Sequence, residues 1–125
     1  MSDTFEAQGT VIAVGLLAAV AVMLFGVVVS PTIAGVDTMV AMMWIFAATF
    51  GAMSVLHAVV GQYNFAWGHG GAAFGWVLIL LESSSFSVTL GLGLLVLSGG
   101  YIFLLSRRSE RQVVDADSEA DQLDS

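Results

Sequence analysis

Apolar residues gather into four long runs, and short polar segments separate these runs. Each run contains 17 to 22 residues and no Asp, Glu, Lys or Arg. An α-helix rises about 1.5 Å per residue, so runs of this length match a hydrocarbon core about 30 Å thick. We therefore predict an all-α integral membrane bundle of four transmembrane helices with short loops, at residues 11–29, 39–60, 65–81 and 86–105.

The segments between the runs carry the residues that end helices. Pro31 follows the first run, and proline cannot continue the hydrogen-bond ladder of a helix. Four residues, 61–64, separate the second and third runs, which is enough for a tight antiparallel hairpin of helices. We therefore expect residues 1–105 to form a single transmembrane domain.

The overall composition agrees with a membrane environment and excludes several kinds of site. The chain is 58% hydrophobic and 10% charged, and it has no cysteine, which rules out disulfides and thiolate metal sites. Ten acidic residues stand against three basic ones, for a net charge of −7, so a nucleic-acid partner is not expected. The acidic, lysine-free composition is similar to that of proteins from halophilic archaea.

The few basic residues indicate an orientation in the membrane. All three follow the last apolar run, as Arg107, Arg108 and Arg111. Because basic residues favour the cytoplasmic side, we expect a multi-pass protein of the cell membrane with both termini in the cytoplasm. Residues 106–125 then form a cytoplasmic arginine cluster and an acidic tail. The tail is expected to be disordered, because it has little apolar surface to bury.

Small residues recur at helical spacing along the second and third runs. Such faces allow two helices in a membrane to approach closely. We expect these two helices to pack against each other through their small faces. The glycines predicted to take part in helix packing are Gly51, Gly61, Gly68, Gly71 and Gly75.

The two histidines of the chain flank the predicted hairpin. His57 and His69 each lie six residues from Tyr63, in the middle of the turn, so they should sit at the same depth. Ionisable residues inside a membrane are functional candidates, and two imidazoles at one level could bind a metal, ligate haem, bind a quinone or pass protons. Alternatively, they form hydrogen bonds with groups such as Ser54 or Tyr63. No carboxylate lies in any run to orient an imidazole, so a metal remains an open question.

No catalytic motif is present, and we do not expect an enzyme. The favoured interpretation is an accessory or structural subunit of a larger membrane complex. Its partners would be the lipid bilayer and other membrane subunits or further copies of itself. One alternative is a homo-oligomeric pore, small transporter or holin-like permeabiliser. Another is a haem- or quinone-binding membrane anchor that uses His57 and His69; outside this alternative no cofactor is expected.

Overall fold

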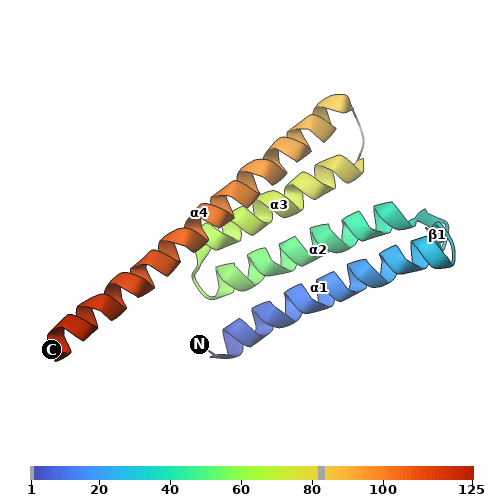
Figure 1. Cartoon of the computed structure of the whole chain (residues 1–125). Coiled ribbons are helices and arrows are strands. Elements are labelled where there is room, and N and C mark those ends of the chain that lie inside the picture. The colour runs from blue at the N-terminus through green and yellow to red at the C-terminus, as the bar shows by residue number, and fades with distance from the viewer. Residues whose placement is uncertain (1, 82–83) are drawn as a thin grey trace.

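The residues that the structure describes form four α-helices and one very short β-hairpin. The computed structural model describes residues 2–81 and 84–125. Within these residues the order is α1 (Ser2–Val28), β1 (Thr32–Ile33), β2 (Val36–Asp37), α2 (Thr38–Val59), α3 (Tyr63–Leu81) and α4 (Ser85–Asp124). Figure 1 shows the four helices running up and down in chain order. The connection between α3 and α4 includes residues 82 and 83, which lie outside the described part.

The β-hairpin joins α1 to α2 and sets the start of α2. Strands β1 and β2 pair antiparallel, and the turn between them places Ala34 and Gly35 at φ 50° and 83°. Asp37 then caps α2, since its side chain accepts a hydrogen bond of 2.7 Å from the backbone N–H of Met39. A short polar side chain at this position satisfies one of the free donors at the start of a helix.

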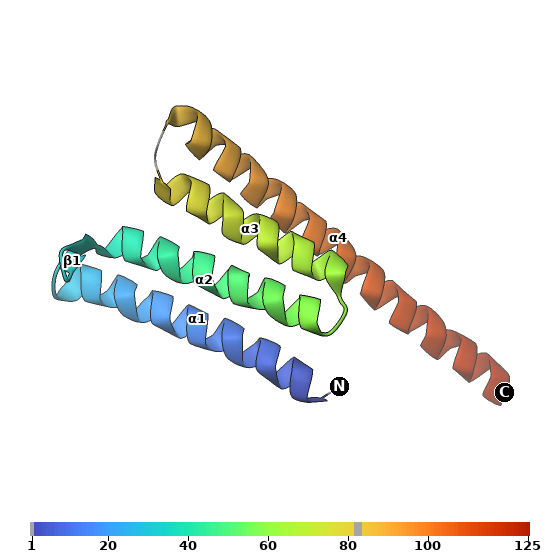
Figure 2. The same ribbon diagram turned by 180° about the vertical axis from the view of Figure 1, so that it is seen from behind.

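The helices form a row in which each one packs on its neighbours in the chain. The extensive contacts are between α1 and α2, α2 and α3, and α3 and α4. Figures 1 and 2, seen from opposite sides, both place α3 between α2 and α4. The N-terminus, the α2–α3 turn and the start of the tail lie towards one end, whereas the β-hairpin lies at the other. The outer helices α1 and α4 therefore each have one main neighbour.

Small side chains fill the space between the helices, and large apolar ones point outwards. Within the described residues the buried hydrophobic side chains are Ala19, Ala47, Met53, Ala66 and Ala72. In contrast, Leu17 on α1 is 69% exposed and Val96 on α4 is 74% exposed. Such a distribution is compatible with a membrane protein, because a soluble protein rarely exposes large patches of apolar side chains.

Three of the helices are long and apolar enough to cross a membrane. These are α1 over Glu6–Val28, α2 over Thr38–Val59, and α4. The fourth predicted span, 65–81, does form a helix, α3, but it is not among them. The reason lies in its sequence, because Asn64, His69 and four glycines lower its hydropathy.

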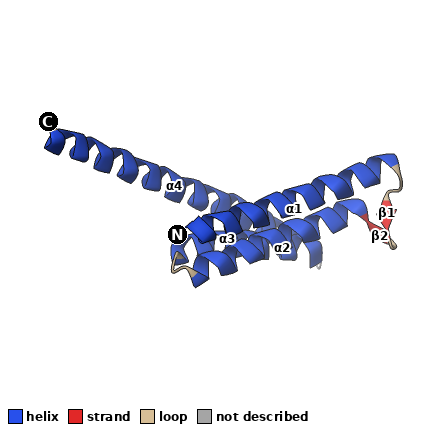
Figure 3. Cartoon of the chain, turned by 90° about the horizontal axis from the view of Figure 1, so that it is seen from below, coloured by secondary structure: helices blue, strands red, loops and turns tan. Residues whose placement is uncertain are grey.

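The tail differs from the sequence prediction. Residues 106–124 continue α4 as an exposed helix, so the prediction of a disordered tail is wrong for this structure. From Tyr101 onwards the chain contains no glycine or proline, and Glu, Arg, Gln, Ala and Leu all favour the helical conformation. Figure 3 shows this part of α4 extending away from the other helices.

The small face of α3 also packs differently from the prediction. A Cβ atom added to Gly68, Gly71 or Gly75 would meet side chains or backbone of α4, so these three glycines face α4 and not α2. Gly75 and Gly91 face each other, and a Cβ atom on either of them would meet the backbone carbonyl oxygen of the other. Gly51 has open space around it, which contradicts the prediction that it mediates helix packing. Several helices have a face lined by small residues. Which of these faces pack against each other depends on how each helix is rotated about its axis.

Candidate histidine site

The two histidines come together because a specific turn joins α2 to α3. Gly61 has a φ of 78°, in the left-handed region that glycine adopts without strain. The N–H of Gln62 donates to the carbonyl of His57 at 2.8 Å, and that of Gly61 donates to Ala58 at 3.1 Å. These two bonds are the Schellman arrangement that ends many helices. Gly61 therefore acts in the turn and not in a helix contact.

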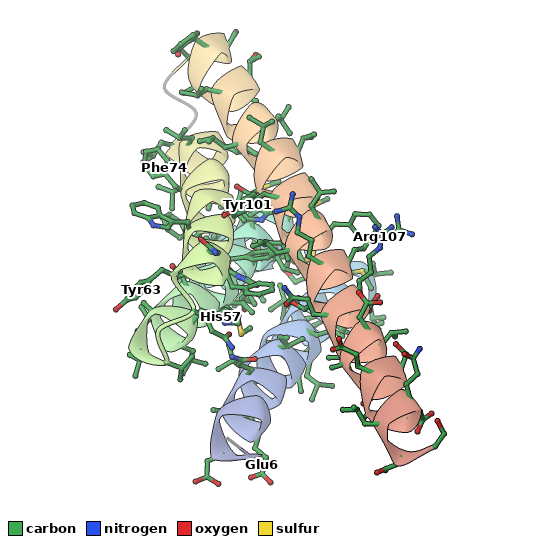
Figure 4. The ribbon with its side chains drawn as sticks, turned by 90° about the vertical axis from the view of Figure 1, so that its left-hand side faces the viewer. Glu6, His57, Tyr63, Phe74, Tyr101 and Arg107 are labelled. Atoms are coloured by element: carbon green, nitrogen blue, oxygen red, sulfur yellow. The ribbon has the colours of Figure 1, made fainter. Side chains whose placement is uncertain are left out.

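His57 is the buried centre of this end of the molecule. Its side chain is 6% exposed, and its Nδ1 lies 2.7 Å from the Oε1 of Gln62 and 3.3 Å from the Nε2 of Gln8. A protonated Nδ1 donates to Gln62, whereas an unprotonated Nδ1 accepts from Gln8. The protonation state of Nδ1 therefore decides whether His57 bonds to the α2–α3 turn or to α1. Figure 4 shows His57 inside the molecule.

His69 lies against His57 from the next helix. The two ring centroids are 4.9 Å apart, with an angle of 30° between the ring planes. The Nδ1 of His69 donates to the carbonyl of Phe65 at 2.8 Å. Phe65 stacks on His57 at 5.3 Å, and Phe50 lies 6.0 Å from His69. The meeting of the two rings agrees with their equal distance from the turn.

The other two polar candidates lie outside this cluster. Ser54 donates to the carbonyl of Ala66 at 2.8 Å and so connects α2 to α3. Tyr63 is 64% exposed, and Figure 4 shows its side chain pointing away from the helices. The sequence analysis missed Gln8 and Gln62. Nothing in the sequence of α1 indicates that Gln8 reaches α2, but Gln62 directly follows the glycine that ends α2.

The geometry of the histidine pair does not suit a haem held between the two rings. Two imidazoles on opposite sides of one iron have metal–nitrogen bonds of about 2 Å, which places the ring centres about 6 Å apart with the porphyrin between them. The observed 4.9 Å is too short. Among the described residues, no group of three or more His, Cys, Asp or Glu is placed to hold a metal ion. The contacts that are present are hydrogen bonds and ring packing.

The three arginines lie on the exposed part of α4, just beyond its apolar segment. The guanidinium of Arg107 lies 5.2 Å from the centroid of the Phe103 ring, one turn back towards the apolar segment. Arg108 lines a groove beside the α2–α3 turn, whereas Arg111 does not. This groove adjoins the histidine cluster, because Gln62 lines the groove and also bonds to His57.

Comparison with protein families, with characterised proteins and with solved structures finds no match to this chain. The arguments about function therefore depend on the geometry of the molecule itself. Two features stand out in that geometry. One is the buried polar cluster around His57, and the other is the open row of helices with its large apolar side chains on the outside.

Proposed function

We propose that this chain is a multi-pass membrane protein that serves as an accessory or structural subunit of a larger membrane complex. The single observation that carries the proposal is the placement of side chains by size. Small residues lie between the helices, and residues such as Leu17 and Val96 point outwards. Lipid and the helices of a partner are the surroundings that accept such a surface.

The proposal includes α3 as a fourth membrane-crossing helix. This helix packs on α2 along one side and on α4 along another, so lipid reaches less of it than of the outer helices. Glycine, histidine and asparagine cost less in a helix that neighbouring helices shield than in one surrounded by lipid. At 19 residues, α3 is about 28 Å long and matches the thickness of the hydrocarbon core.

The orientation follows from the three arginines. They lie at the same end of the molecule as the N-terminus and the α2–α3 turn. Under the positive-inside rule this end faces the cytoplasm, and the β-hairpin faces the opposite side. Both termini are then cytoplasmic in a cell membrane.

A subunit role is favoured over a pore because the glycines of α3 are used inside the chain. Gly68, Gly71 and Gly75 pack against α4. The outer helix α4 has further glycines that meet open space, where a partner helix has room to approach: Gly93, Gly99 and Gly100. The outer helices α1 and α4 each have one main neighbour, which leaves most of their surface for other helices. The histidine cluster, in turn, joins α2 to α3 through ring packing and supports a stable scaffold, while His57 bonds to either the turn or α1.

Site-specific photocrosslinking in native membranes tests this proposal. A photoreactive residue at Leu17 or Val96, on the outer faces of α1 and α4, is expected to crosslink to another membrane protein in a fixed ratio. The same residue at Met53, a large side chain on α2 that is 4% exposed, serves as the matched internal control and should yield only intramolecular products.

Native mass measurement of the detergent-extracted protein provides the second readout. A subunit is expected in a particle that contains at least one further polypeptide. A particle whose mass is a multiple of 13.1 kDa would instead support a homo-oligomer. A 13.1 kDa monomer with no crosslinked partner at either outer position would refute the proposal.

A further inference from the structure

A polar groove lies where the α2–α3 turn meets α4. It has a volume of about 490 Å³. The amide side chains of Gln62, Asn64 and Gln112 line it together with the guanidinium-bearing Arg108. Apolar residues, among them Leu105, form another part of the wall. The groove therefore combines hydrogen-bonding groups, one cation and an apolar side.

The position of the groove along α4 sets the depth at which it meets the bilayer. Leu105 is the last residue of the apolar segment, and the arginines begin two residues later. Tyr63, which also lines the groove, is a residue type that favours the boundary between lipid and water. If the chain crosses the membrane as proposed above, the groove opens at the level of the lipid headgroups.

The charge in the groove is unusual for this protein. The chain has a net charge of −7 and only three basic residues, and Arg108 is the one that lines the groove. Within the part of the chain that the structure describes, no ion pair with Arg108 is found. The nearest acidic residue in sequence, Glu110, does not line the groove but lines the adjoining surface of α4, which shares Ser109 with it. Arg108 is thus available to an external anion.

We propose that this groove binds the phosphate of an acidic phospholipid headgroup. A guanidinium forms paired hydrogen bonds with phosphate oxygens, and phosphate is the anion that lipid headgroups supply. The groove also contains Gln62, Asn64 and Gln112, whose amides can bond the hydroxyls of a glycerol headgroup, and apolar Leu105, which suits the start of an acyl chain. Basic pockets between helices on the cytoplasmic side of membranes suit such headgroups.

Lipid retention measured by native mass spectrometry tests the proposal. The full-length protein in mild detergent is incubated with phosphatidylglycerol or with phosphatidylcholine. The unmodified protein should retain phosphatidylglycerol in preference to phosphatidylcholine. Arg108→Gln should weaken the apparent affinity for phosphatidylglycerol about tenfold, because it removes a charge-assisted hydrogen bond to the phosphate. Arg111→Gln removes the same charge outside the groove and should change retention by less than about twofold, and circular dichroism verifies that both variants remain helical.

Three outcomes would overturn the assignment. Equal retention of the two lipids would show that the groove does not recognise an acidic headgroup. Equal loss in the Arg108 and Arg111 variants would show only a general effect of charge. Displacement of the lipid by glycerophosphoglycerol at the same concentration would show a site for a soluble phosphate ester. The inference rests on the proposed membrane location, but crosslinking at Leu17 and Val96 is independent of Arg108, so the two proposals can fail separately.

Discussion

Replacing Gly91 with alanine tests the close contact between α3 and α4. The backbones of these helices approach each other at Gly75 and Gly91, where neither residue has a side chain to keep them apart. A Cβ atom at position 91 would lie 2.6 Å from the carbonyl oxygen of Gly75 and 2.8 Å from Cγ1 of Ile79. Ordinary contacts begin at 3.4 Å, so the helices would have to separate by about 0.8 Å.

The size of the effect follows from comparison with Gly93, two residues along the same helix. A Cβ atom at Gly93 meets nothing within 4 Å. Both substitutions gain the same helical preference of alanine over glycine, about 1 kcal/mol, and only Gly91→Ala adds the steric cost. Forcing extra volume into a packed contact costs about 1 to 3 kcal/mol. The free energy of unfolding of Gly91→Ala should therefore lie about 1 to 3 kcal/mol below that of Gly93→Ala.

The measurement is reversible unfolding in mixed detergent, with increasing dodecyl sulfate, followed by circular dichroism and tryptophan fluorescence. Because the two variants differ only in position, their difference in unfolding free energy isolates the steric contact. The double variant Gly75→Ala/Gly91→Ala should cost less than the two single changes together, because one separation of the helices relieves both clashes. Equal stability of Gly91→Ala and Gly93→Ala would refute the close contact.

Three further predictions follow from other parts of the molecule. The chain has no cysteine, so single-cysteine variants can be labelled without background: an impermeant maleimide should reach Glu6→Cys and Ser125→Cys from one side of the membrane and Thr32→Cys from the other. Termini on opposite sides would mean an odd number of crossings and exclude α3 as a span. Gly61→Ala should lower the unfolding free energy by about 1 kcal/mol because φ at this position is 78°, whereas Gly51→Ala, which meets open space, should not; equal effects would contradict this. Gln62→Ala should cost about 1 to 2 kcal/mol because it removes a hydrogen-bond partner of buried His57, and exposed Gln122→Ala should stay within about 0.5 kcal/mol; no difference between these two would argue against the hydrogen bond.

The sequence was sufficient to predict the helices and the meeting of the histidines. Four uncharged runs separated by turn residues predicted four helices, and all four are present. Equal spacing of His57 and His69 from Tyr63 placed the two rings at one level of the hairpin, and their centroids are 4.9 Å apart. Both predictions depend on local features, namely the length of a run and the symmetry of a tight turn.

The choice of helix partners could not be predicted in the same way. The glycines of α3 mark a face suited to close packing, but the sequence does not show whether this face packs on the small residues of α2 or on those of α4. The rotation of each helix about its axis decides between them, and it depends on all the contacts of the row at once. The same holds for Gln8, whose contact with His57 requires α1 to lie beside the end of α2. The tail was wrongly predicted because a low apolar content indicates exposure, and an exposed segment without glycine or proline can still be helical.

Because α4 is one continuous helix, the way it packs on α3 also determines the direction in which the side chains of its acidic tail point. One helix of 40 residues, about 60 Å long, runs from Ser85 through the contact at Gly91 to Asp124. Glu110, Asp117 and Asp121 recur at spacings of seven and four residues and so share one side of it. A roll of α4 by about 20° at the glycine contact would swing these carboxylates through an arc of roughly 2 Å. The rotation of α4 about its axis at the Gly75–Gly91 contact therefore sets the direction in which the carboxylates of the tail point.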